Sequence, residues 1–184
     1  MLTLILDNGS PFVIDISTYL NKLNINFERI FHDELKIPEL DKYDHVILSG
    51  RQKNNTDTNF TNFRVIDYCQ CNNIPLLGIC YGAEAINLFN GGTLIKMDNY
   101  VKDYLEIVIS KSNKLLEKNA MFNVYESHKY AISRLPSSFE SVAYSKFNKY
   151  EIIRHKSKNI YGVQFHPEKS GNMGFIIFSN FINK

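Results

Sequence analysis

The stretch LLGICYG at residues 76–82 is the part of the sequence that decides the fold. An apolar run leads into Gly-x-Cys-x-Gly, and apolar residues at helical spacing then continue to Phe89. This succession of strand, sharp turn and helix is the layout of a nucleophile elbow, with cysteine in place of serine. A lone cysteine is more often a buried structural residue. The flanking glycines, which remove Cβ atoms from a crowded turn, instead favour Cys80 as a nucleophile at the carboxyl end of a strand.

Segments with strand and helix patterns alternate on both sides of this stretch. The patterns predict strands at residues 2–6, 26–31, 46–48 and 75–79, and helices at 12–23, at 63 to about 72, and at 83–89. The second half predicts strands at 105–109, 123–126, 141–144, 151–154 and 160–164, and a last helix at 171–182. We therefore expect one α/β domain over residues 1–184, with a largely parallel sheet, helices on both faces and added antiparallel strands.

The composition argues against several classes of protein. Charged residues are 22% of the chain and the net charge is +2, a balance that favours neither a nucleic-acid nor a membrane partner. Residues 1–7 are apolar but lack the basic start and cleavage site of a signal peptide. The three cysteines are too few and odd in number for a secreted disulfide framework, which predicts a cytoplasmic protein.

A second informative stretch is YGVQFHPE at residues 161–168, where an apolar strand ends in His-Pro-Glu. A histidine at a strand end can reach a nucleophile at the end of a neighbouring strand. A carboxylate two residues later can hold the imidazole in one tautomer and stabilise its cationic form. Such a pair is weak evidence by itself, but beside Cys80 it completes a triad of Cys80, His166 and Glu168.

Residues 78–82 and 162–168 resemble the two signature motifs of the class I glutamine amidotransferases, in the same order and at a similar separation. Between them, Glu-Ser-His at residues 126–128 resembles a segment of the amidotransferase part of GMP synthase, and residues 6–10 resemble the start of such domains. The resemblance implies a flavodoxin-like three-layer sandwich that hydrolyses glutamine through a Cys80 thioester. It implies no metal or organic cofactor on this chain. The remaining implied site residues are the oxyanion group Gly50, Arg51 and Tyr81, and the glutamine-binding group Glu84, Ser127 and His128.

Two positions depart from the family pattern. Arg51 and Gln52 follow Gly50 where the family usually has Gly-Pro, in the loop whose backbone N–H stabilises the oxyanion. Glu84 replaces a glutamine that lines the substrate pocket in the family. Glu84 either binds the substrate ammonium, or indicates another γ-glutamyl substrate, or caps its helix.

The sequence contains neither a phosphate-binding loop of the Gly-Lys-Ser/Thr type nor a Ser-Gly-Gly-x-Asp-Ser pyrophosphatase loop. The resemblance therefore implies a separate synthase partner, of the ATP pyrophosphatase type, that carries ATP and Mg²⁺. The Ser-His segment favours GMP synthase, which converts XMP to GMP. The alternatives are the amidotransferase component of anthranilate or aminodeoxychorismate synthase, a stand-alone γ-glutamyl hydrolase or peptidase, and a non-catalytic regulatory subunit.

Overall fold

The computed structural model describes residues 1–118 and 120–183, and at its centre lies a nine-stranded sheet. The strands run in the order β2-β1-β3-β4-β9-β8-β7-β5-β6. Their bounds are β1 Leu2–Asp7, β2 Asn26–Phe31, β3 His45–Leu48, β4 Leu76–Ile79, β5 Thr93–Ile109, β6 Met121–Arg134, β7 Phe139–Tyr144, β8 Ile152–His155 and β9 Ile160–Val163.

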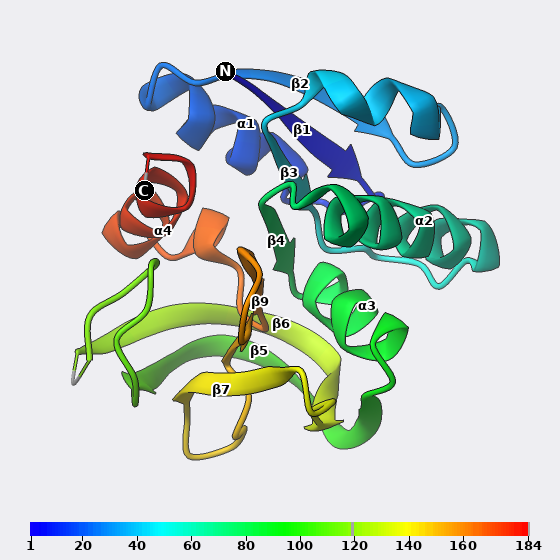
Figure 1. Ribbon diagram of the computed structural model, residues 1–184. Coiled ribbons are helices and arrows are strands. Elements are labelled where there is room, and N and C mark those ends of the chain that lie inside the picture. Colours follow the sequence, from blue (N-terminus) through cyan, green and yellow to red (C-terminus); the bar gives the residue numbers. More distant parts are fainter. Residues whose placement is uncertain (119, 184) are drawn as a thin grey trace.

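Helices cover both faces of the parallel half of the sheet (Figure 1). On one side lie α1 (Val13–Lys22) and α4 (Asn172–Asn183), and on the other lie α2 (Thr56–Asn72) and α3 (Tyr81–Phe89). Two short 3₁₀ helices, η1 (Ile37–Lys42) and η2 (Pro167–Lys169), complete the described elements. Each face has its own buried apolar cluster, so the sheet is sandwiched between two hydrophobic layers. None of the helices among the described residues is long and apolar enough to cross a bilayer.

The parallel strands have the flavodoxin-like order, which confirms the predicted fold class. Strands β2, β1, β3, β4 and β9 pair in parallel, and their carboxyl ends meet at one edge. The antiparallel half, β8-β7-β5-β6, extends the sheet beyond β9. Strand β9 is last in the sequence but central in the sheet, so the second signature motif lies beside the first.

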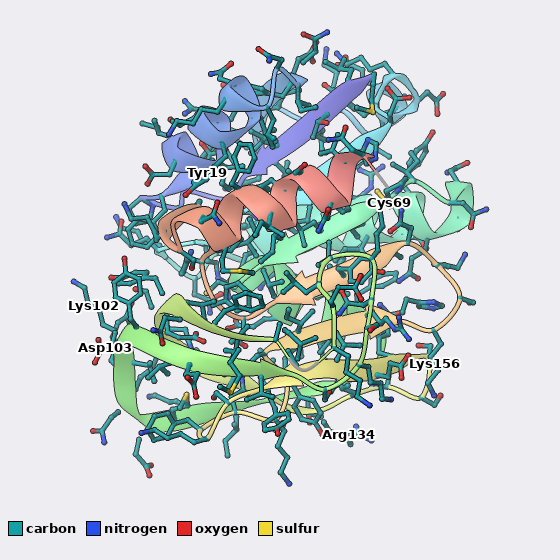
Figure 2. All side chains as sticks on the ribbon, turned by 90° about the vertical axis from the view of Figure 1, so that its left-hand side faces the viewer. Tyr19, Cys69, Lys102, Asp103, Arg134 and Lys156 are labelled. Atoms are coloured by element: carbon teal, nitrogen blue, oxygen red, sulfur yellow. The ribbon has the colours of Figure 1, made fainter. Side chains whose placement is uncertain are left out.

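The long β5–β6 hairpin was only partly predicted. The strands expected at residues 105–109 and 123–126 are the ends of much longer strands that pair over most of their length. Most residues of β5 before Leu105 are polar and partly or fully exposed, so they lack the apolar alternation that marks a half-buried strand. Figure 2 shows Lys102 and Asp103 at the outer edge of the molecule, where β5 passes Ser127 and Glu126 of β6.

Two helices pack where the patterns indicated, with shifted ends. Helix α2 begins at Thr56 rather than near residue 63, because the side chain of Asn55 caps it by accepting a hydrogen bond from Asp57 N at 2.9 Å. Tyr19 of α1 lies beside α4 (Figure 2), and its hydroxyl donates to Gly171 O at 2.8 Å. This contact joins α1 to the start of α4, close to the second motif.

Candidate active site

Cys80 occupies a strained turn between β4 and α3. Its φ is +50°, a conformation that non-glycine residues seldom adopt, and its N–H donates to Val163 O at 2.7 Å. A Cβ on Gly78 would lie 2.5 Å from the backbone of Gly82, and one on Gly82 would lie 2.5 Å from Leu48 O. Only glycine fits at these two positions, which is the physical reason for the Gly-x-Cys-x-Gly pattern. The thiol is buried rather than prominent, at the floor of a cavity.

His166 approaches Cys80 from the neighbouring strand. Because β9 pairs in parallel with β4, the chain that leaves Val163 delivers His166 beside the elbow. Nδ1 of His166 lies 2.8 Å from Oε1 of Glu168, and both side chains are buried. The imidazole also packs edge-on against Phe12, with 4.9 Å between ring centroids. The structure therefore brings Cys80, His166 and Glu168 together as the sequence predicts.

The charges of this group favour proton transfer from sulfur to nitrogen. Burial raises the pKa of the Cys80 thiol, and His166 opposes that rise. Burial alone would lower the pKa of His166, but Cys80 and Glu168 outweigh it and raise the pKa to about 11. A carboxylate on Nδ1 fixes the hydrogen there and leaves Nε2 as the proton acceptor. The group can thus form a thiolate and an imidazolium side by side.

The loop after β3 lies against the same two side chains. A Cβ on Gly50 would lie 3.1 Å from Cε1 of His166 and 3.8 Å from Cβ of Cys80, so a side chain there would press on the imidazole. Arg51 is not among the residues with positive φ, so its backbone conformation is one that a non-glycine residue tolerates.

The side chain of Arg51 holds this loop to α2 and α3. Its guanidinium lies 3.7 Å from the ring centroid of Tyr81, the residue after the nucleophile. Arg51 Nη1 donates to Oδ1 of Asn59 at 2.6 Å, and the Tyr81 hydroxyl donates to the same oxygen at 2.8 Å. Sequence reasoning missed Asn59, because the start of α2 was not predicted and an isolated asparagine carries no signal.

A cavity of about 700 Å³ opens above Cys80, large enough for an amino acid. The expected site residues that line it are Arg51, Cys80, Tyr81, Glu84, Ser127, His128 and His166. Ser127 O lies 4.0 Å from the Cys80 sulfur, so β6 forms the wall opposite the elbow. Gly50 and Glu168 stand behind this lining, in contact with or bonded to His166.

Glu84 is a buried acid in the cavity wall. Nε2 of Gln164 donates to its Oε1 at 3.3 Å. Burial raises the pKa of Glu84 to about 7, while Gln164, His128, Arg51 and His166 act in the opposite direction. A carboxyl group with a pKa near neutrality can gain or lose its charge as a cationic group enters the cavity.

The two cysteines of α2 lie in different environments. Cys69 is buried and Cys71 is exposed, so the Cys-x-Cys pair does not converge on one point. Across the described residues, no group of three or more His, Cys, Asp or Glu side chains is arranged to hold a metal ion.

A family model described as glutamine amidotransferase class-I matches residues 4–184. The chain belongs to the class I glutamine amidotransferase family. It is 32% identical to a subunit of glutamine-hydrolysing GMP synthase from Methanococcus maripaludis, with 98% of this chain and 95% of that protein covered. The corresponding protein of Methanocaldococcus jannaschii is also 32% identical, with coverage of 89% and 86%.

Solved structures agree with these sequence matches. The crystal structure of a putative GMP synthase subunit from Thermoplasma acidophilum superposes with a TM-score of 0.89 at 29% identity, covering 99% of this chain and 92% of that one. A glutamine amidotransferase from Thermotoga maritima shares the fold, with a TM-score of 0.79 at 18% identity over 94% of this chain and 78% of that one.

Proposed function

We propose that this amidotransferase is the glutamine-hydrolysing subunit of a two-subunit GMP synthase, and that it supplies ammonia for the conversion of XMP to GMP. The observation that carries the hydrolytic part is the buried Cys80 elbow facing the His166–Glu168 pair, whose side chains are 2.8 Å apart. The likeness to GMP synthase subunits over nearly the whole chain supports the acceptor. Free thiols throughout the described residues suit a reducing cytoplasm.

The reaction proceeds in two halves. The Cys80 thiolate attacks the side-chain carboxamide carbon of glutamine, and the backbone N–H groups of Arg51 and Tyr81 stabilise the oxyanion. The imidazolium of His166 gives its proton to the departing nitrogen, so ammonia leaves and a glutamyl thioester remains. His166 then takes a proton from water, which attacks the thioester and releases glutamate and the thiol.

Two groups of residues in the cavity wall orient the substrate, one binding its α-ammonium and the other its α-carboxylate. Ionised Glu84 attracts the α-ammonium of glutamine, and backbone groups of Ser127 and His128 hold its α-carboxylate. Glu84 therefore replaces a neutral family residue without changing which substrate is bound. ATP and Mg²⁺ act on the synthase partner, which activates the acceptor, and this chain needs neither for glutamine hydrolysis.

Glu84 gives a first test of this orientation. Glu84→Ala should raise KM for glutamine by about one to two decades and leave kcat nearly unchanged, because a charge-assisted hydrogen bond contributes roughly 1.5–3 kcal/mol to binding. Since burial raises the pKa of Glu84 to about 7, the charged form is present above that pH. The wild-type KM should therefore fall as pH rises through neutrality.

Glu84→Gln is the matched control for shape. Its amide oxygen still accepts a hydrogen bond, so its KM should lie between those of the wild type and the alanine variant, without the fall near neutral pH. An unchanged KM in Glu84→Ala would show that Glu84 serves its helix instead. If Glu84→Gln gained a glutaminase activity that the wild type lacks, free glutamine would not be the native substrate.

The acceptor is tested by reconstitution. We expect GMP to form when this chain is mixed with an ATP pyrophosphatase subunit of GMP synthase, XMP, ATP, Mg²⁺ and glutamine, as followed by chromatography. The isolated chain should hydrolyse glutamine slowly, because Arg51 ties the oxyanion loop to α2 until a partner docks. One absent oxyanion donor costs about 10²–10³-fold in turnover.

Three results of the reconstitution would redirect the assignment. Activation only by a chorismate-using synthase would identify an anthranilate or aminodeoxychorismate partner. Full activity without a partner, greatest on other γ-glutamyl compounds, would indicate a stand-alone hydrolase. Failure of Cys80 to react with a glutamine-like affinity label, alone or in the complex, would indicate a regulatory subunit.

A further inference from the structure

Three titratable side chains are buried together at the β6 wall of the cavity, one lining it and two behind it. Glu126 and His128 are alternate residues of β6 and therefore face the same side of the sheet, where Glu151 joins them from just before β8. Their exposed fractions are 0% for Glu126, 1% for Glu151 and 6% for His128. Neither carboxyl group takes part in the proposed reaction. Burying two acids is costly unless protons or partners neutralise them.

The contacts of His128 leave one nitrogen free to exchange a proton. Nδ1 lies 2.7 Å from the backbone oxygen of Tyr130, which can only accept a hydrogen bond, so Nδ1 carries a hydrogen. Nε2 lies 2.9 Å from Oε2 of Glu126. The charge of the imidazole therefore depends on whether the shared proton lies on Nε2 of His128 or on Oε2 of Glu126.

The carboxyl groups of Glu126 and Glu151 act on each other: Glu151 lowers the pKa of Glu126, and Glu126 raises the pKa of Glu151. Apart from Nε2 of His128, none of the described residues offers a hydrogen-bond partner to either oxygen of Glu126 or to Oε2 of Glu151. Two carboxyl groups in contact do not both ionise readily. Burial raises the pKa of Glu126 to about 7 and that of Glu151 well above its ordinary value, while burial lowers the pKa of His128. In the empty site, burial therefore favours the protonated form of both acids and the neutral form of the imidazole.

We propose that Glu126 and Glu151 are positioning residues that store a proton for His128, so that its imidazole becomes cationic when the α-carboxylate of glutamine enters the cavity. The carboxyl hydrogen of Glu126 moves to Nε2 of His128. The carboxylate left on Glu126 then accepts the carboxyl hydrogen of Glu151. Charge is conserved within the three groups, and no proton comes from solvent.

The shift creates a dipole with its positive end towards the substrate. His128 lines the cavity, and Glu126 and Glu151 lie fully behind it, so the new positive charge is nearer to the entering carboxylate than the new negative charge. Glu84 of α3 and His166 after β9 also act on the imidazole. The other charged or titratable groups that line the same cavity are Cys80, Arg51 after β3, Tyr81 of α3, Tyr100 and Lys102 of β5, and Lys129 and Tyr130 of β6. Because the carboxylate left on Glu151 offsets part of the attraction, we expect a gain of about tenfold in affinity rather than a hundredfold.

The test rests on the proposed glutamine site and uses the full chain with Cys80→Ala, which binds the substrate without hydrolysing it. Isothermal titration calorimetry at one neutral pH compares glutamine with its α-amide, glutaminamide. Both ligands carry the α-ammonium, so the contribution of Glu84 cancels in the ratio of their dissociation constants. Only the response to the α-carboxylate remains in that ratio.

Two isosteric variants should move this ratio differently. Glu126→Gln has no acidic hydrogen to give, so His128 stays neutral and the preference for glutamine over glutaminamide should fall about tenfold. Glu151→Gln leaves Glu126 without an acidic neighbour, so Glu126 ionises and His128 is already cationic before the ligand arrives. Its preference for glutamine should equal or exceed that of the parent.

The opposite behaviour of the two variants separates a proton store from a structural role. A fall in preference in both variants, or in neither, would overturn the inference, as would equal losses for both ligands. Thermal denaturation checks that each variant folds. If Glu126→Gln does not fold, Glu151→Gln alone decides: a reduced preference for glutamine over glutaminamide overturns the inference, and a retained or increased preference supports it. Absence of glutamine binding to the Cys80→Ala chain would overturn the inference and the substrate assignment together. Normal binding ratios without GMP formation in the reconstitution would refute the acceptor alone.

Discussion

Cys80→Ala and Cys80→Ser should abolish glutamine-dependent product formation in the reconstituted synthase, by on the order of 10⁴-fold or more, because no other group at the elbow can form the thioester. The same complexes should use ammonium salts at the wild-type rate, since free ammonia enters the partner reaction after this site. Product formation is measured with each nitrogen source in turn.

Cys71→Ser is the matched control, because Cys71 is exposed on α2 and should be replaceable without effect on either nitrogen source. Equal loss with glutamine and with ammonium in the Cys80 variants would refute the ammonia-donor function. That result would mean that Cys80 supports the complex structurally.

His166→Ala should reduce steady-state glutamine hydrolysis by about 10²–10⁴-fold, the usual contribution of general acid–base catalysis. The imidazole serves both halves of the reaction, so the variant should either fail to acylate or accumulate the thioester. Glu168→Ala should be milder, because Glu168 acts through Nδ1 of His166 and does not touch the substrate. Glutamate release and intact-protein mass spectrometry measure the rate and the trapped acyl-enzyme.

His155→Ala provides the control for removing an imidazole. Its ring nitrogen accepts hydrogen bonds from its own loop, at Ser157 N and Lys158 N, away from the cavity. Wild-type turnover in His166→Ala would be incompatible with the triad. A loss in Glu168→Ala as large as in His166→Ala would mean that the carboxylate does more than orient the ring.

The local patterns predicted the strands and motifs of the parallel half because these carry strong signals, whereas the start of α2 was missed. Close backbone contacts require glycine on both sides of Cys80, so residues 76–82 alone were enough to predict the elbow. The apolar strand before His166 is buried throughout, which gives it a continuous apolar run. The order and separation of the two motifs, at residues 78–82 and 162–168, then predicted that the ends of the two strands meet, although no distance was known.

The rest depends on tertiary contacts that short windows do not contain. Residues at the start of β5 are exposed on both faces, and their pairing with β6 includes a register shift between Lys96 and Val101. Asn59 acts only through Arg51 and Tyr81, which lie on other elements. Glu151 resembles any surface acid in the sequence and becomes distinctive only when β8 brings it against Glu126.

The position of β9 also determines when, during translation of the chain, the active site becomes complete. Strand β4 carries the elbow early in the chain, but its inner neighbour is β9, whose backbone oxygen at Val163 receives the Cys80 N–H. On the ribosome, β4 emerges with that edge open, and the thiol has neither its base nor this hydrogen bond. The nucleophile therefore matures only after translation has passed Glu168, so a nascent chain carries an incomplete centre that cannot hydrolyse glutamine.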